Sequence, residues 1–439
     1  MDHQLYQNHL SILKEELHVA MGCTEPIAVA YAGAVARKTL GFLPQHCRVR
    51  CSGNIVKNVK GVVVPNSGGM RGIAVAAVLG IVGGDPDKKL AVLQSVTPQH
   101  QLLTRKLLDD GFCTCDLIKG VDNLYIILEV EGEGQQALVE IQERHDNITR
   151  LEKNHTVLFQ RQEAEAQSNE YAGSPALLTI ENSLAFADEA KLEDLEAVLE
   201  PQMRYNAAIS QQGLETPWGA CVGRTLLGEG EASARILARA WAAAGSDARM
   251  GGCALPVVIN SGSGNQGLTI SMPLLVYGDK LHTSRETLLR ALALANLLAV
   301  HQKKYIGRLS AYCGATSAGC AAACGVAYLK YRDKMEQEDF YQLLCGVITN
   351  ALCTLGGMLC DGAKSSCAAK ISLAVEAGLL ALDMAVQGHV FQPGEGLTME
   401  NAEQTVAAIG HVAHSGMQQT DLEILQLMLS SHYTAEQPD

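Results

Sequence analysis

The segment at 355–370, LGGMLCDGAKSSCAAK, places three chemically different side chains within five positions. An apolar, glycine-rich run reaches Cys360 and is followed at once by Asp361 and, three residues later, Lys364. A structural core does not need a thiol, a carboxylate and an ammonium on one flexible turn, so the segment predicts a site. Burial raises the pKa of a carboxyl group and lowers that of a lysine, so Asp361 or Lys364 is a candidate catalytic base. Alternatively, the two charged residues pair with each other and pin the turn.

Two other cysteines lie in or directly before predicted helices. Cys23, in the motif Gly-Cys-Thr-Glu-Pro, directly precedes a helix of small residues expected at 26–40. We expect Thr24 to cap this helix and the helix N-terminus to favour a thiolate at Cys23. Cys313 lies in the stretch 309–329, which has no charged residue and predicts a buried helix. The alternative is that both cysteines are ordinary buried thiols.

The chain has fourteen cysteines but neither a Cys-x-x-Cys nor a His-x-x-x-His pair, which excludes zinc-ribbon, zinc-finger and ferredoxin-type motifs. A site assembled from distant single cysteines remains open. The best set takes one cysteine from each glycine-containing turn, namely Cys23, Cys313 and Cys360. Three thiolates can hold a [4Fe-4S] cluster and leave one iron open to substrate, by the logic that leaves catalytic zinc an open position.

Two uncharged, glycine-rich loops offer hydrogen bonds to a substrate. VPNSGGMRG at 64–72 leads into an apolar run, and SGSGNQG at 261–267 follows the short apolar stretch LPVVIN. Backbone N–H groups in such turns bind anions, whereas hydroxyl and amide side chains bind carboxylate or amino groups. A flexible connection is the alternative for the second loop. We predict substrate contacts from Asn66, Ser67, Gly68, Ser261, Ser263, Asn265 and Gln266.

Composition limits the class of partner. The 439 residues are 47% apolar and only 5% aromatic, and the net charge is -13. An acidic chain argues against nucleic acid or an anionic membrane surface, so we expect a small-molecule ligand. The uncharged stretch 309–329 is too rich in Ser, Thr, Gly and Ala to lie in lipid. Because the first residues do not resemble a signal peptide, we expect a cytoplasmic protein with reduced thiols. We also expect a homo-oligomer.

The hydrophobic pattern predicts an α+β protein with two regions. Beyond residue 175 the pattern is helical almost to the end. We predict a largely helical catalytic body formed by 1–44 plus 170–439, with a small α+β domain inserted at 45–169. The polar stretch 161–171 is the expected linker between them. The inserted domain is predicted from a helix near 101–110 and from β-branched runs at 47–51, 58–65, 124–130, 136–141 and 148–159.

Six motifs carry a resemblance to a known family: GCTEP at 22–26, VPNSGGMRG at 64–72, SGSGNQG at 261–267, CGATSAG at 313–319, GGMLCDGAKSSCAAK at 356–370 and AIGHVAHSGMQQTD at 408–421. Together they resemble the L-cysteine desulfidase family, which is related to the catalytic chain of bacterial iron–sulfur L-serine dehydratases. The resemblance implies an oxygen-sensitive [4Fe-4S] cluster on three cysteines, which carry over by motif to Cys23, Cys313 and Cys360. Other cysteines lie near these motifs, so the motif match leaves open a shift of the second or third ligand by one helical turn. These cysteines are Cys320, Cys324, Cys345, Cys353 and Cys367.

The activity implied by this resemblance is conversion of L-cysteine to pyruvate, hydrogen sulfide and ammonia without pyridoxal phosphate. The open iron would act as a Lewis acid while a base removes the Cα proton. The dehydratase relatives carry a histidine-bearing motif where this chain has Cys-Thr-Glu-Pro, so the base stays unassigned between Lys364 and Asp361. Lys304 is a weaker candidate, for which the alternative is a residue on a helix surface. L-serine dehydration is an alternative with the same chemistry. A non-catalytic iron–sulfur sensor is another, although the sequence contains no basic helix-turn-helix that would serve as its effector segment.

Overall fold

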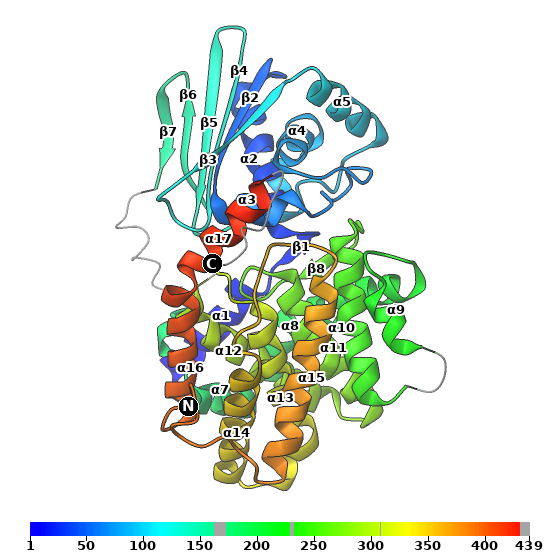
Figure 1. Cartoon of the computed structure of the whole chain (residues 1–439), viewed down its shortest axis with the longest axis vertical. Coiled ribbons are helices and arrows are strands. Elements are labelled where there is room, and N and C mark those ends of the chain that lie inside the picture. The colour runs from blue at the N-terminus through cyan, green and yellow to red at the C-terminus, as the bar shows by residue number, and fades with distance from the viewer. Residues whose placement is uncertain (162–172, 229–231, 308, 431–439) are drawn as a thin grey trace, which may run out of the picture.

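The structure is a computed structural model that describes residues 1–161, 173–228, 232–307 and 309–430. It is mostly helical and contains a mixed six-stranded sheet, which confirms the predicted α+β class. Figure 1 shows the sheet region at one end of the long axis and a helical region at the other. No described helix is long and apolar enough to cross a membrane. Apart from Arg161, the predicted linker at 161–171 lies outside the described residues.

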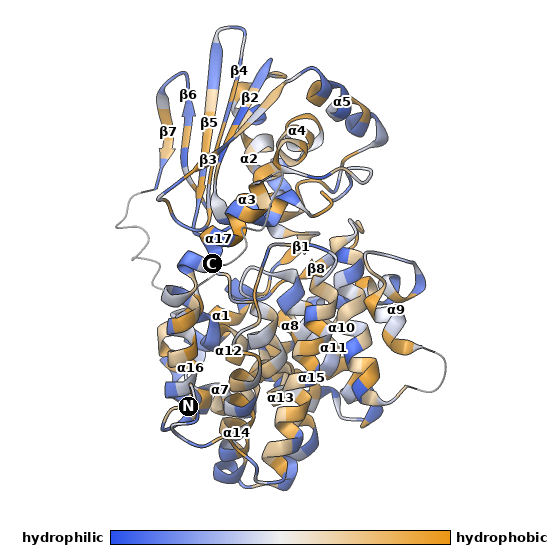
Figure 2. Ribbon diagram, in the orientation of Figure 1, coloured by the Kyte–Doolittle hydropathy of each residue, from blue (hydrophilic) through white to orange (hydrophobic). Residues whose placement is uncertain are grey.

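The sheet has the strand order β3-β2-β4-β5-β6-β7, in which β2 and β3 are parallel and the other neighbours are antiparallel. Buried and less buried residues alternate along β5, as expected for strands with one covered face. Figure 2 shows hydrophilic residues at the hairpin tips farthest from the helical region. The bounds are β2 (His46–Ser52), β3 (Cys113–Ile118), β4 (Tyr125–Gly132), β5 (Gln135–Gln142), β6 (Ile148–Lys153) and β7 (Thr156–Gln160).

Small residues let helices pack closely beside this sheet. Helix α2 (Thr24–Leu40) packs on β4 and β5 and on α4 (Ile73–Gly83). At Gly80 a Cβ atom would lie 2.1 Å from the carbonyl oxygen of Ala30, so only glycine allows α2 and α4 this approach. The other helices here are α3 (Gly53–Lys60), α5 (Pro98–Asp109) and the 3₁₀ helix η1 (Pro86–Ala91).

Two local predictions in this region are wrong. The run 58–65, predicted as a strand, begins in helix α3. This segment is helical because Ile55 and Val59 of α3 repeat at helical spacing and are both buried. Thr24 does not cap α2; Cys23 occupies that position, and the Thr24 hydroxyl donates to the carbonyl of Gly262 at 2.9 Å. The predicted helix end at Gly41 is confirmed.

The helical region is organised around α13 (Gly314–Tyr331), which is buried along most of its length, as predicted. A Cβ atom at Gly319 would lie 2.4 Å from the carbonyl oxygen of Ala374 in α15, so these two helices are in close contact. Helix α8 continues through Pro201. The bounds are α1 (His3–Glu16), η2 (Pro175–Leu177), α7 (Ile180–Glu189), α8 (Leu192–Glu215), α9 (Val222–Leu227), α10 (Ala234–Met250), α11 (Gly264–Lys280), α12 (Arg285–Ile306), η3 (Arg332–Lys334), α14 (Gln337–Leu355), α15 (Cys367–Val386), α16 (Ala402–His411), η4 (Val412–Gly416) and α17 (Gln418–Leu429).

Contacts between the two regions bring distant motifs together. Strand β1 (Val19–Met21) pairs antiparallel with β8 (Pro256–Val258), so the approaches to Cys23 and to the loop 261–267 lie side by side. Helix α17 packs on α3, where the buried ammonium of Lys57 pairs with Asp421. Helix α2, assigned above to the helical body, packs on the sheet instead. The division into 1–44 plus 170–439 and 45–169 stays a prediction.

Candidate active site

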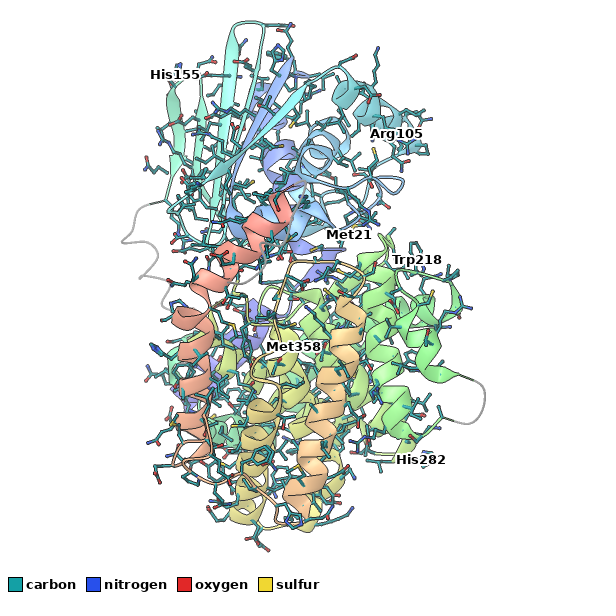
Figure 3. All side chains as sticks on the ribbon, in the orientation of Figure 1. Met21, Arg105, His155, Trp218, His282 and Met358 are labelled. Carbon is teal, nitrogen blue, oxygen red and sulfur yellow. The ribbon has the colours of Figure 1, made fainter. Side chains whose placement is uncertain are left out.

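Cys23, Cys313 and Cys360 line one cavity of about 100 Å³, together with Cys367. The other thiols named above as possible ligands do not line it; Cys320 and Cys324 are buried in the core of the helical region. Met21, two residues before Cys23, lies close to the junction of the two regions in Figure 3, and Met358, two residues before Cys360, lies farther into the helical region. The structure therefore brings the three predicted cysteines together, and their role as ligands stays a prediction.

Backbone hydrogen bonds hold Cys313 and Cys360 next to each other. The N–H of Cys360 donates to Ala311 at 2.5 Å, and that of Cys313 donates to Met358 at 3.0 Å. Gly362, which follows, has φ +92°, and a Cβ atom there would lie 2.4 Å from the carbonyl oxygen of Lys57. Only glycine fits this turn, which explains the glycine after Cys360-Asp361.

Contacts made by the residues before and after Cys23 hold it in place at the start of α2. Gly22 before it has φ +51°, and a Cβ atom there would lie 2.1 Å from the ring of Pro65. The Cys23 thiol donates to Glu25 Oε2 at 2.9 Å, and Asn58 donates to Glu25 Oε1 at 3.2 Å. Burial alone would raise the pKa of the Glu25 carboxyl, but attraction to His145, the thiol hydrogen bond and Arg249 lower it overall. A buried carboxylate therefore stands beside the first thiol.

Burial keeps the thiols of Cys23, Cys313 and Cys367 protonated at neutral pH. It raises the pKa of Cys313 to about 12, with a further contribution from nearby Cys360, and raises the pKa of Cys23 well above its usual value. Burial also raises the pKa of Cys367. Because thiolates and not thiols bind metals, loading of this site must release protons.

The donor set fits a group larger than a single ion. Within the described residues, no three His, Cys, Asp or Glu side chains are gathered so as to hold one metal ion. Four thiols instead surround a shared cavity, and thiolate is the usual ligand of iron–sulfur clusters. The residues present therefore fit the cluster that the motif resemblance implies, with Cys23, Cys313 and Cys360 as its holders.

The loop 261–267 contributes three of its four predicted residues. Ser263, Asn265 and Gln266 line the cavity. The side-chain oxygens of Asn265 and Gln266 are buried without a hydrogen-bond partner among the described residues. Ser261 faces elsewhere, because its hydroxyl donates to Asn260 at 2.8 Å. Unpaired buried acceptors are costly, so the two amides predict a ligand that donates hydrogen bonds.

Asn66, Ser67 and Gly68 are not brought to the thiols. They line a separate hollow with Trp218 and Gly252. The Asn66 amide donates to Leu93 at 2.9 Å, which ties the loop to that neighbouring segment, and the Ser67 hydroxyl donates to Met70 at 3.0 Å within the loop. The loop instead reaches the site through Pro65, which packs against Gly22.

Asp361 and Lys364, the predicted bases, form an ion pair. Lys364 and Lys370 each donate to Asp361 Oδ1 at 2.5 Å. Burial opposes ionisation of the Asp361 carboxyl, but the hydrogen bonds from the two lysines lower the pKa of Asp361 to about 2. Neither predicted base lines the cavity. The geometry supports the alternative in which the pair pins the turn, and a role in proton transfer stays a prediction.

Several cavity-lining residues were missed from the sequence: Glu25, Asn58, Arg249, Lys303 and Tyr312. Glu25 had a usable signal, since it lies two residues after Cys23 in a quoted motif. Lys303 lies on the buried face of α12 near its end, one residue before Lys304, whose ammonium donates to Leu178. Arg249 ends an alanine-rich helix, where a basic residue is usually a surface feature.

Comparison with known proteins gives consistent matches. The family model described as serine dehydratase alpha chain matches residues 87–426. A UPF0597 protein of Lachnoclostridium phytofermentans is 42% identical over 426 residues, which cover 97% of this chain and 100% of that protein. UPF0597 proteins of Finegoldia magna and Treponema denticola are 43% and 40% identical, over 96% and 98% of this chain and 99% of each relative. The family match covers Cys313 and Cys360, and the relatives extend it towards Cys23.

Proposed function

Because this chain belongs to the serine dehydratase alpha chain family and to the UPF0597 family, we propose that it is an iron–sulfur-dependent lyase acting on L-cysteine. Family membership suggests β-elimination from an amino acid as the class of reaction. Within that class we propose L-cysteine desulfidase activity, which yields pyruvate, hydrogen sulfide and ammonia. The desulfidase motifs support this choice of substrate.

The thiol-lined cavity is the observation that carries the proposal. Cys23, Cys313 and Cys360 come from three motifs far apart in the sequence and line one small space beside a polar loop. We propose these three as the ligands of a [4Fe-4S] cluster, with Cys367 as an additional thiol. When bound, a cluster with one open iron supplies a Lewis acid that stabilises negative charge on the substrate.

The surrounding side chains have separate tasks in this proposal. Asn265 and Gln266 accept hydrogen bonds from the substrate ammonium group and so orient the amino acid. Elimination removes the Cα proton and breaks the Cβ–S bond, which releases sulfide and aminoacrylate. The aminoacrylate then becomes an imine, and water hydrolyses it to pyruvate and ammonia. Glu25 and Lys303 are ionisable side chains that line the cavity and can take up the Cα proton.

L-serine is the second candidate substrate, and the description of the matched family favours it. The same residues would bind it, since L-serine and L-cysteine share the ammonium and carboxylate groups. The leaving group would then be hydroxide instead of sulfide. The products distinguish the two reactions, because only L-cysteine yields sulfide.

The test is an anaerobic assay after reconstitution with iron and sulfide and removal of excess reagents. We expect L-cysteine to give pyruvate and newly released sulfide in equal amounts, with a higher kcat/KM than L-serine. Reconstitution in the presence of an iron chelator is the matched control and should abolish both products. A cluster that forms but turns over neither amino acid would contradict the lyase proposal and favour a sensor. Preference for L-serine would replace the proposed substrate.

A further inference from the structure

Arg249 is a buried cation in the wall of the thiol-lined cavity. It lies in the last turn of α10 and is only 2% exposed. In the part of the chain that the structure describes, its guanidinium makes no hydrogen bond, and its Nε is buried without a partner. A buried guanidinium with unsatisfied N–H groups is costly, so its position calls for an anionic ligand.

The neighbouring anions do not fill this need. Glu25 attracts Arg249 electrostatically, but its Oε2 accepts from the Cys23 thiol and its Oε1 accepts from Asn58. While Cys23 is a thiol, each oxygen of the Glu25 carboxylate thus already accepts a hydrogen bond. It provides a counter-charge for Arg249 but not the paired contacts that a guanidinium can make.

The loop 261–267 leaves room for the guanidinium. A Cβ atom at Gly264 would lie 2.5 Å from Arg249 Nε and 3.0 Å from its Cζ. Any larger residue at Gly264 would push the guanidinium away from the first turn of α11. The unpaired oxygens of Asn265 and Gln266 follow directly in the sequence and line the same cavity. One side of the cavity therefore carries unpaired donors and unpaired acceptors close together.

We propose that Arg249 binds the α-carboxylate of the substrate while Asn265 and Gln266 bind its α-ammonium group. This inference rests on the proposed function, and it defines the substrate class as free α-amino acids. The proposal excludes amines and amino-acid amides, because they have no carboxylate. It also excludes a residue whose amino group is part of a peptide bond, because that residue has no α-ammonium group. Arg249 is thereby assigned to substrate binding and specificity, separate from the thiols.

The test measures binding of an amino acid that has no leaving group. L-alanine cannot undergo elimination, and L-alaninamide differs from it by lacking the carboxylate. Binding of both ligands to the anaerobically reconstituted full chain is measured by calorimetry for wild type, Arg249→Gln, Arg249→Lys and the control Arg239→Gln. Arg239 lies in the same helix and pairs with Glu376 outside the cavity.

We expect Arg249→Gln to weaken L-alanine binding by about 10- to 100-fold, the usual loss for a charge-assisted hydrogen bond. L-alaninamide should bind weakly and equally to wild type and variant, and Arg239→Gln should leave both affinities unchanged. Arg249→Lys keeps the charge without the paired N–H groups and should fall between wild type and Arg249→Gln.

Equal weakening of both ligands by Arg249→Gln and Arg249→Lys would overturn the inference, because it would mean a structural role. Absence of L-alanine binding to the wild type would overturn it as well. Neither result depends on turnover, so failure of the L-cysteine assay alone would contradict the proposed function and leave the carboxylate contact standing. Should Arg249→Gln not fold, Arg249→Lys carries the comparison.

Discussion

Replacing Cys360 with alanine is expected to remove the bound iron and to lower lyase activity by more than about 100-fold, beyond the loss typical of a residue that only supports a metal ligand. Cys360 lies in the cavity wall, and its backbone is fixed by the hydrogen bond to Ala311. Alanine keeps that bond, so the fold should persist while one of three thiolates is lost. Iron content and the rate of sulfide release, both measured anaerobically, check this expectation.

Two other cysteines provide matched controls for Cys360→Ala. Cys353 lies in α14, 3.3 Å from the hydroxyl of Thr398 and outside the cavity lining, so Cys353→Ala should keep its iron. Cys367 lines the cavity, and Cys367→Ala should also keep its iron if the motif cysteines are the ligands. If Cys367→Ala loses its iron while Cys360→Ala retains it, then Cys367 is a ligand in place of Cys360.

A methyl group at Gly267 is expected to destabilise the protein by about 2–3 kcal/mol, at the upper end for overpacking. Its Cβ would lie 2.0 Å from the carbonyl oxygen of Val258, in strand β8. That strand cannot yield easily, because Val258 pairs with Val19 in β1, on the way to Cys23. The start of α11 would have to move instead, taking Asn265 and Gln266 with it. Catalytic efficiency should therefore fall together with stability.

Urea denaturation and anaerobic kinetics check the Gly267→Ala prediction. Gly357→Ala is the control, since a Cβ atom at Gly357 would meet nothing within 4 Å and its φ is not positive. The control should unfold like the wild type. A Gly267→Ala variant with wild-type stability and kinetics would show that α11 tolerates displacement from β8.

The sequence carried enough information to predict the fold class and the convergence of the thiols. Cys23 and Cys313 each lie next to a glycine directly before a helix, and Cys360 lies two residues before Gly362, so each belongs to a glycine-containing turn and not to a helix interior. The buried, small-residue helix that became α13 was also predictable, because uncharged Ala, Gly, Ser and Cys favour close helix packing.

Other features depended on contacts that one segment alone does not reveal. The run 58–65 has β-branched residues that suit a strand, yet packing of Ile55 and Val59 places its first three residues in helix α3. The loops 64–72 and 261–267 were both predicted to contact substrate, but only the second follows β8, which pairs with β1 beside Cys23. Arg249 looks like a basic residue at a helix end until the fold buries it.

The most direct test of the central claim is Mössbauer spectroscopy on protein reconstituted anaerobically with iron-57, recorded with and without L-cysteine. A cluster held by only three cysteines has one iron site that differs from the other three. We predict that L-cysteine changes the signal of one iron in four and leaves the others in place. Four equivalent irons that do not respond to L-cysteine would contradict the account.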